Sequence, residues 1–265
     1  MRLRTKHTYS EGFFELFQDG SYRSAQVIVP LVLQWVEPKR VVDVGCGVGL
    51  WLAVVKEHGI EDVLGIDGDY VSRETLRIPE EHFRAIDLEK PIELREKFDL
   101  AISMEVAEHI GPQYADTFVN SLTSLSSVVL FSAAIPFQGG THHLNEQWPD
   151  YWVRRFEKRG YVVVDCIRKH VWENSDVEPW YAQNTVLFVR ETELPNYPAL
   201  ERERTLSSMQ MLSVVHPALW VNAHTGFEQR IVRSMRKTTD IVRSGAGRVK
   251  ARVLRGMRAR DQDSV

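Results

Sequence analysis

The chain has 265 residues, of which 43% are hydrophobic and 26% charged, and its formal net charge is −3. It is long enough for one large domain, or for a domain with an appendage. It contains no apolar run of about 18 residues for a spanning helix, and no apolar core after its charged start for a secretory signal. Its two cysteines, Cys46 and Cys166, form no closely spaced pair, which predicts a reducing compartment and a cytoplasmic protein.

The first predicted element is a helix from Tyr22 to Val36. Its apolar residues recur at helical spacing, and Ser21 precedes it as a suitable N-cap. A short buried strand at 41–44 follows, and a second helix is predicted to end near His58, where Gly59 provides the stop.

A glycine-rich turn, Gly45 to Gly49, joins that first strand to the second helix. Such a turn lets a ligand approach bare main chain at a helix N-terminus. The spacing is G-x-G-x-G, and Leu50 stands where a dinucleotide fingerprint has its last small residue. The turn also lacks the Lys and Ser or Thr of a phosphate-binding loop. It therefore favours a nucleoside without a pyrophosphate. Cys46, which has no neighbouring His in the sequence, is interpreted as a small packing residue rather than a nucleophile.

The second predicted strand, at 63–66, leads to Asp67, whose carboxylate can accept hydrogen bonds from both hydroxyls of a ribose. Strands then alternate with helices, which predicts a doubly wound, mostly parallel sheet. The further strands are predicted at 83–86, 98–103, 128–134, 161–167 and 185–190. In such sheets a ligand binds at the carboxyl ends of the strands. Asp67, Asp87, Glu105 and the loop at Pro136 are expected at that edge.

Four motifs, in this order, resemble those of class I S-adenosylmethionine-dependent methyltransferases. They are Asp43 to Gly49, Asp67, Ile86-Asp87-Leu88, and the fourth strand continued by Ser103-Met104-Glu105-Val106-Ala107-Glu108-His109. The resemblance covers roughly residues 20 to 190 and implies a Rossmann-like sheet of seven strands with an antiparallel strand at its end. It also implies S-adenosylmethionine as the cofactor. The implied cofactor-binding residues are Asp43, Gly45, Cys46, Gly47, Gly49, Asp67, Gly68, Asp87, Leu88, Met104 and Glu105.

An oxygen or nitrogen acceptor of a methyl group benefits from a general base, for which His is the usual choice. His142 and His143 follow Gly139-Gly140 in the loop after the fifth strand, and one of the two is the preferred candidate. The alternative for this pair is a role in fastening the loop. His109, after the fourth strand, is a further candidate base, although orienting the chain beside the cofactor is the better interpretation for it.

A divalent ion on His142, His143 and Glu146 is the remaining alternative for the loop. Adjacent histidines rarely bind one ion well, and no D-x-D cluster accompanies them. No metal is therefore predicted.

The predicted methyltransferase domain covers residues 1–192, and 193–265 is predicted to be a linker followed by a helical tail. Between Phe227 and Arg260 the tail has eleven Lys and Arg but only Glu228 and Asp240 as acidic residues. A basic amphipathic helix of this kind can lie on the inner face of a membrane or on a partner protein. Nucleic acid is not expected, because the tail lacks interleaved aromatic residues for base stacking.

The preferred hypothesis is methyl transfer to a hydroxyl of a sugar or glycan-linked small molecule, because the chain resembles methyltransferases of bacterial polysaccharide and glycolipid biosynthesis. Methylation of a quinone or another metabolite is a second hypothesis. The third is a cofactor-binding subunit without catalysis, which docks a glycosyltransferase or a membrane through the tail.

Overall fold

The fold is centred on one mixed sheet. The structure, a computed structural model, describes residues 11–225, with side chains from Gly20 onward except that of Met209. Within this range seven strands form the sheet in the order β3-β2-β1-β4-β5-β7-β6. They are β1 (Arg40–Val44), β2 (Asp62–Asp67), β3 (Phe83–Ala85), β4 (Leu100–Met104), β5 (Val128–Ser132), β6 (Tyr161–Val164) and β7 (Val186–Arg190). β1 to β5 pair in parallel, and β7 runs antiparallel to both β5 and β6. The predicted fold class is confirmed.

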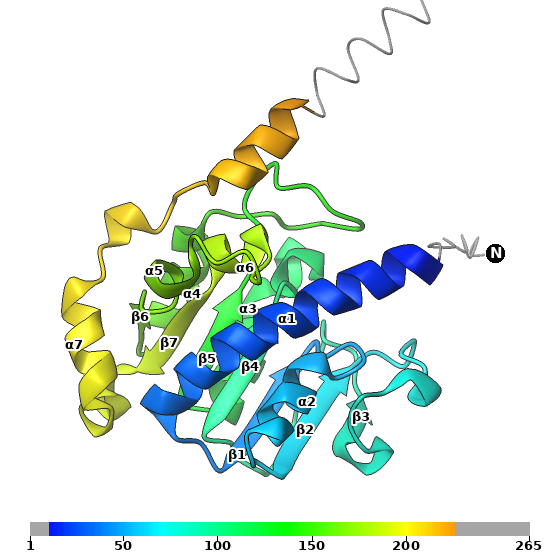
Figure 1. Cartoon of the computed structure of the whole chain (residues 1–265). Coiled ribbons are helices and arrows are strands. Elements are labelled where there is room, and N and C mark those ends of the chain that lie inside the picture. The colour runs from blue at the N-terminus through cyan, green and yellow to red at the C-terminus, as the bar shows by residue number, and fades with distance from the viewer. Residues whose placement is uncertain (1–10, 226–265) are drawn as a thin grey trace, which may run out of the picture. The chain divides into compact units, whose positions relative to one another are not determined.

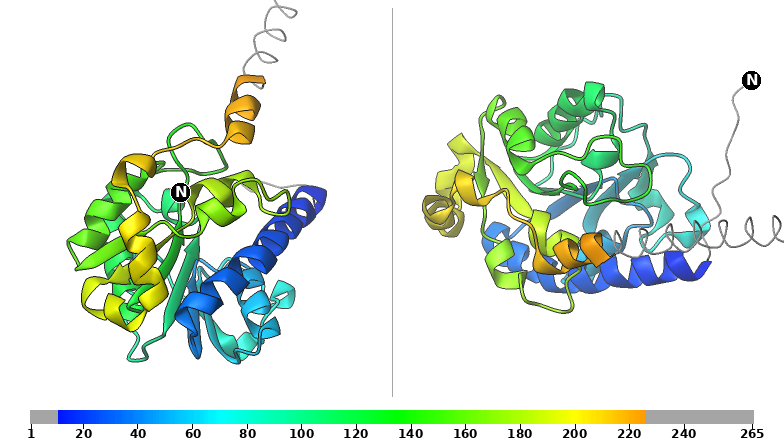
Figure 2. Two further views of the ribbon diagram at one scale, coloured as in Figure 1. Left: turned by 60° about the vertical axis from the view of Figure 1, so that its left-hand side comes forward. Right: turned by 90° about the horizontal axis from the view of Figure 1, so that it is seen from above.

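Helices cover both faces of this sheet (Figure 1). The α-helices are α1 (Glu11–Val36), α2 (Leu50–Glu57), α3 (Ala115–Leu125), α4 (Pro149–Glu157), α5 (Arg168–Val171), α6 (Pro179–Asn184) and α7 (Pro198–Leu206). Short 3-10 turns lie at Arg73–Thr75, Glu80–His82, Ala107–His109, Pro112–Tyr114, Glu191–Asn196 and Met209–Met211. Figure 2 shows α1 and α2 together on one side of the strands, and α3 and α4 pack on the other.

Two apolar cores result from the alternation of side chains along the strands. Val41 faces the core that contains α1 and α2, whereas Val42 and Val44 face the core that contains α3 and α4. Because both faces are covered, these strands are nearly continuous runs of apolar residues. The carboxyl edge of the sheet is therefore the place where polar residues can gather.

The start of α1 differs from the prediction. The helix begins at Glu11 and passes through Ser21 without a break, so that Ser21 is not an N-cap. Its hydroxyl instead lies 3.0 Å from the hydroxyl of Tyr181 on α6. The Ser21 side chain therefore makes a tertiary hydrogen bond and does not cap a helix.

The compact unit extends to His216, beyond residue 192 where the sequence predicts its end. Leu194, Leu200 and Leu212 are buried in the two cores. The side chain of Arg168 donates to the carbonyl oxygen of Leu212 at 2.9 Å. The prolines that suggest a linker include the first residue of α7, a position that proline suits.

A second unit begins at Pro217, and its described residues, 217–225, are helical. The predicted basic tail at 226–265 lies outside the described residues. Among residues 11–225, none of the helices combines the length and the apolar character that crossing a bilayer demands.

Candidate functional site

The glycine turn presents bare main chain at the carboxyl end of β1. Gly45, Gly47 and Gly49 have φ angles of 86°, 52° and 85°, in the left-handed region that favours glycine. The N–H of Gly45 donates to the carbonyl oxygen of Ile66 at 2.8 Å, which ties the turn to β2. A Cβ built on Gly47 would meet no atom within 4 Å. The main chain at Gly47 is therefore open to a ligand.

Gly45 is fixed by packing as well as by its backbone angle. A Cβ at this position would stand 2.5 Å from Cγ1 of Val106, which follows β4. We expect Gly45→Ala to lower the free energy of unfolding by about 3 kcal/mol, because it adds overpacking to the cost of a left-handed alanine. Gly47→Ala carries only the backbone cost of about 1 kcal/mol, since the space beside it is open.

Chemical denaturation of the two glycine variants measures this difference. Equal losses of stability in Gly45→Ala and Gly47→Ala would contradict the packing role of Gly45.

Asp67 links the turn to the end of β2. The residue is 4% exposed. Its carboxylate accepts hydrogen bonds from the N–H groups of Gly47 at 2.7 Å and Gly68 at 2.6 Å, and from the hydroxyl of Tyr70. Tyr70 as a whole is exposed, and the hydrogen bond of its hydroxyl to Asp67 is partly buried. The carboxylate is held in place from its inner side by main-chain donors.

Asp43 lies behind the turn and is 2% exposed. Its Oδ2 atom has no hydrogen-bond partner among the described residues. Burial, and secondarily the charge of Asp67, raise the pKa of Asp43 well above its usual range. A buried carboxylate without a partner is costly, so this oxygen fits a site that receives a polar ligand.

The other predicted cofactor residues divide into buried and exposed groups. Cys46, Leu88 and Met104 are buried, and burial raises the pKa of the Cys46 thiol, which agrees with a packing role. Asp87 is exposed, and its carboxylate lies 3.2 Å from the ammonium of Lys90. The structure thus places Asp87 on the solvent side, beyond the end of β3.

Glu105 is strained and half-buried at the carboxyl end of β4. Its φ of 54° is unusual for a residue other than glycine and typical of functional positions. Its carboxylate accepts hydrogen bonds from Gln138 at 2.9 Å and from Asn184 at 3.1 Å. Asn184 and the neighbouring Gln183 also bond to Gln138.

Sequence reasoning missed Gln138, Gln183 and Asn184. The signal for Gln183 and Asn184 is the long segment at 168–184, whose length is typical of a functional loop. Gln138 lies beside Pro136, in the loop that the topology places at the carboxyl edge. Burial raises the pKa of Glu105, while its amide and hydroxyl partners oppose that shift.

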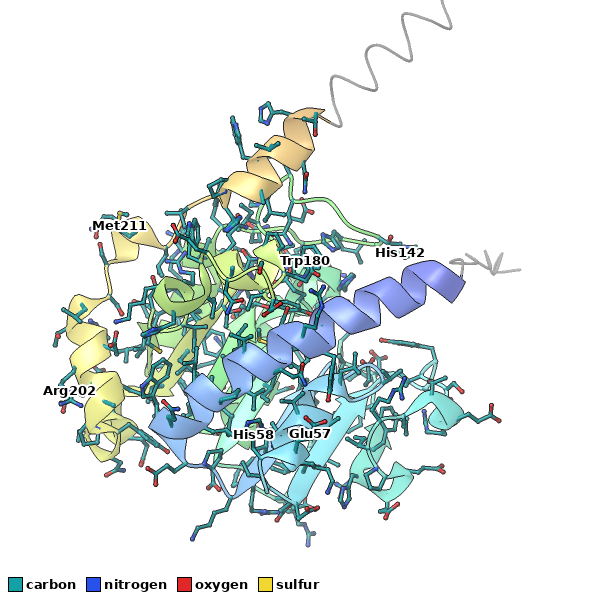
Figure 3. All side chains as sticks on the ribbon, in the orientation of Figure 1. Glu57, His58, His142, Trp180, Arg202 and Met211 are labelled. Atoms are coloured by element: carbon teal, nitrogen blue, oxygen red, sulfur yellow. The ribbon has the colours of Figure 1, made fainter. Side chains whose placement is uncertain are left out.

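The three candidate histidines lie in unequal positions. The rings of His109 and His143 meet edge to face, with their centroids 4.9 Å apart. Nδ1 of His143 lies 2.8 Å from Oε1 of Glu146. His142 is exposed and has a φ of 59°, and its carbonyl oxygen lies 3.3 Å from Nδ1 of His109. Figure 3 shows His142 on the outer part of the loop that follows β5.

The structure therefore brings the rings of His109 and His143 into contact, and it places the side chain of His142 in an exposed position. The protein atoms around His109 desolvate its ring and, with the nearby His143, lower its pKa. A lowered pKa favours the neutral imidazole, the form that a base or a metal ligand needs.

Glu108 lies beside these histidines and is 0% exposed. Neither of its carboxylate oxygens has a hydrogen-bond partner among the described residues. Burial, together with the nearby Glu105, raises the pKa of Glu108 well above its usual range. Sequence analysis used Glu108 as part of a motif without giving it a role.

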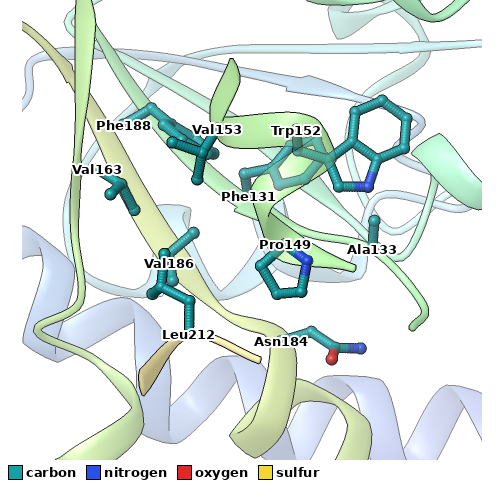
Figure 4. Close-up of a pocket in the computed structure, with 10 residues that line it drawn as sticks. All are labelled: Phe131, Ala133, Pro149, Trp152, Val153, Val163, Asn184, Val186, Phe188 and Leu212. Carbon is teal, nitrogen blue, oxygen red and sulfur yellow. The ribbon is translucent and has the colours of Figure 1, made fainter. Parts of the chain in front are cut away.

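A small cavity lies elsewhere, between α4 and the strands (Figure 4). Most of its lining is apolar, including Phe131, Trp152 and Phe188, and Asn184 stands at one end. It contains none of the residues of the glycine turn, and we interpret it as a packing gap in the core.

Comparison with known proteins shows the family to which this chain belongs. A family model described as a methyltransferase domain matches residues 20–174, more than half of the chain. No curated protein matches the chain.

Solved structures of similar fold include the sugar N-methyltransferase KedS8 from Streptoalloteichus sp ATCC 53650, at 13% identity and a TM-score of 0.51 over 72% of this chain and 98% of that one. The S-adenosylmethionine-bound amino pentose methyltransferase CalS10 from Micromonospora echinaspora has 13% identity and a TM-score of 0.51, over 71% and 100%. The methyltransferase domain of bacterial CtHen1 has 22% identity and a TM-score of 0.46, over 63% and 96%.

Proposed function

This chain belongs to the methyltransferase-domain family, and we propose that it transfers the methyl group of S-adenosylmethionine to a hydroxyl of a sugar or glycan-linked acceptor. The observation that carries this proposal is the carboxyl edge of the sheet. One half of this edge consists of the open main chain at Gly47 and the buried carboxylate of Asp67. The other half consists of the polar side chains bonded to Glu105, together with His109 and His143. Each half has a separate role in the reaction.

The first half fits the cofactor. The main chain at Gly47 is open, the unpartnered oxygen of Asp43 lies behind it, and Asp67 holds a carboxylate at the end of β2. Asp67 would accept hydrogen bonds from the ribose hydroxyls, which could replace its contact with Tyr70. The bound cofactor supplies an electrophilic methyl group on a sulfonium. The task of the chain is to hold the acceptor in line and to promote loss of its proton.

The second half fits a polar acceptor. Glu105, Gln138, Gln183 and Asn184 form a connected network of hydrogen-bond donors and acceptors. A sugar needs side-chain partners of this kind, whereas a quinone needs an apolar slot. The network therefore supports a sugar over a quinone.

Activation of the acceptor hydroxyl is assigned to His143, with His109 beside it. Glu146 orients the His143 ring through Nδ1, and the carboxylate of Glu146 is itself held by the N–H groups of Phe137 at 2.8 Å and Gly139 at 2.9 Å. Because of this support from Glu146, we prefer His143 to His142 as the residue that promotes loss of the proton.

Incubation with S-adenosylmethionine labelled in its methyl group tests the proposal. The acceptors are sugar nucleotides and glycolipids extracted from bacterial envelopes, with quinones as a parallel set. We expect label in the carbohydrate fraction as an ether stable to mild base. Label only in the quinone set would favour a metabolite methyltransferase, and cofactor binding without any transfer would favour a subunit without catalysis.

A further inference from the structure

Three side chains with metal-ligating atoms converge where β4 and β5 end. One such atom from each of Glu108, His109 and His143 lies within 4.8 Å of the other two. Glu108 and His109 follow β4, whereas His143 belongs to the loop after β5. The N–H groups of Leu144 and Asn145 donate to the carbonyl oxygen of Glu108 at 2.8 and 2.9 Å. The main chain therefore fastens the two segments to each other and sets the distance between their side chains.

Glu108 is the member of this cluster that needs a partner. It is 0% exposed, and both carboxylate oxygens lack a hydrogen bond among the described residues. Buried charges in proteins are paired or coordinate metals, because an isolated one loses its hydration without compensation. A cation beside the carboxylate would compensate for the lost hydration.

His143 is oriented in the way that ligand histidines commonly are. Its Nδ1 lies 2.8 Å from a carboxylate oxygen of Glu146. Such a carboxylate–histidine contact fixes the tautomer and the direction of the ring, and it leaves Nε2 for an ion. Glycine at position 140 gives the ring room, because a Cβ there would stand 2.8 Å from Cδ2 of His143.

We propose that Glu108, His109 and His143 bind one divalent transition-metal ion. Two imidazoles and one carboxylate suit Mn²⁺, Co²⁺ or Zn²⁺, whereas Mg²⁺ and Ca²⁺ prefer ligand sets made of oxygen. Three protein ligands leave coordination positions open for water or for an oxygen of a second molecule. The site is therefore of the open, catalytic type.

The role of this ion rests on the proposed function, although its binding does not. An acceptor hydroxyl that occupies an open position loses its proton more readily, because the cation stabilises the alkoxide. The proton passes to water, the alkoxide oxygen forms a bond to the methyl carbon, and the carbon–sulfur bond breaks, with its electron pair remaining on sulfur. His109 and His143 thus activate the hydroxyl as ligands of the ion.

Titration of the chelator-treated full chain with Co²⁺ alone tests the binding. We expect one equivalent to bind with a visible absorption band of imidazole-coordinated Co²⁺, and a large excess of Mg²⁺ not to displace it. Glu108→Gln and His143→Gln are expected to weaken binding by at least about 100-fold, since loss of a mere supporting partner costs 10- to 100-fold. His142→Asn is the matched control, because asparagine tolerates a positive φ, and it should bind Co²⁺ like the wild type.

Thermal unfolding separates a ligand role of Glu108 from a structural one. Co²⁺ should raise the melting temperature of the wild type and of His142→Asn in a concentration-dependent way. Glu108→Gln should be at least as stable as the wild type without the ion, because it replaces a buried ionisable group with a neutral side chain of the same size. Co²⁺ should not raise its melting temperature. If Glu108→Gln binds Co²⁺ as the wild type does, or if the wild type binds none, the proposed site is wrong.

The two proposals fail in different ways. Asp67→Ala should lose cofactor binding while retaining Co²⁺ binding. Binding of Co²⁺ by the three ligands in a chain that methylates nothing would support the metal site and contradict the proposed function. Full methyl transfer by metal-free protein would contradict the catalytic role of the ion and leave the proposed function standing.

Discussion

Replacement of His143 by glutamine is expected to lower kcat by about 100- to 10,000-fold, the range that a residue promoting proton transfer contributes. Glutamine keeps a polar side chain of similar length but lacks the imidazole nitrogen through which His143 promotes loss of the proton. The KM for the cofactor should stay close to that of the wild type, because the glycine turn and Asp67 are untouched. Steady-state kinetics with labelled cofactor measure both quantities.

His142→Asn is the control for this variant, and we expect its kcat to be about that of the wild type. Its side chain is exposed, whereas the group of potential ligands consists of Glu108, His109 and His143. A large loss of kcat in His142→Asn with little loss in His143→Gln would reverse the assignment.

The second large effect is expected at Asp67. Asp67→Ala should weaken S-adenosylmethionine binding by about 100-fold or more, because each hydrogen bond to a charged group contributes about 1.5–3 kcal/mol and two ribose hydroxyls are involved. The N–H of Gly47 would also lose the partner that holds the turn. Equilibrium dialysis with radiolabelled cofactor gives the dissociation constants.

Asp69→Asn is the matched control for Asp67→Ala. Asp69 is two residues away, its side chain is 93% exposed, and it pairs with Arg73 at 3.1 Å. Its cofactor affinity should equal that of the wild type. Comparable weakening in both variants would indicate a general effect of charge and would contradict a specific ribose contact.

The cofactor half of the site could be predicted because it follows from topology. A strand, a glycine turn and a helix are local features, and parallel strands bring their carboxyl ends to one edge. The turn at Gly45 to Gly49 and Asp67 were therefore placed together by the sequence pattern alone, and the structure joins them through Gly47. Asp87 shares the edge by topology, but its exposure depends on the direction that the chain takes after β3.

The acceptor half depends on contacts between distant segments, which no local pattern encodes. Asn184 reaches Glu105 across 79 positions of sequence, and the loop after β5 carries His143 to His109. The ion considered from the sequence used the neighbours His142 and His143. In the fold the ligating atoms that lie near His143 as a group are those of Glu108 and His109.

The sequence predicts the end of the compact unit at residue 192, earlier than in the structure, for a similar reason. Prolines near 195–198 are typical of a linker, yet burial of Leu200 and the hydrogen bonds of Arg168 to the carbonyl oxygens of Met211 and Leu212 keep 193–212 on the sheet domain. Tertiary packing decides such boundaries, and the local sequence alone does not show it.

Calorimetric titration of the full chain with S-adenosylhomocysteine, the product left after methyl transfer, tests the central claim most directly. The account predicts binding of one equivalent per chain, with an affinity that falls steeply in Asp67→Ala and is unchanged in Asp69→Asn. Absence of binding to the wild type, or equal binding in the wild type and Asp67→Ala, would contradict it.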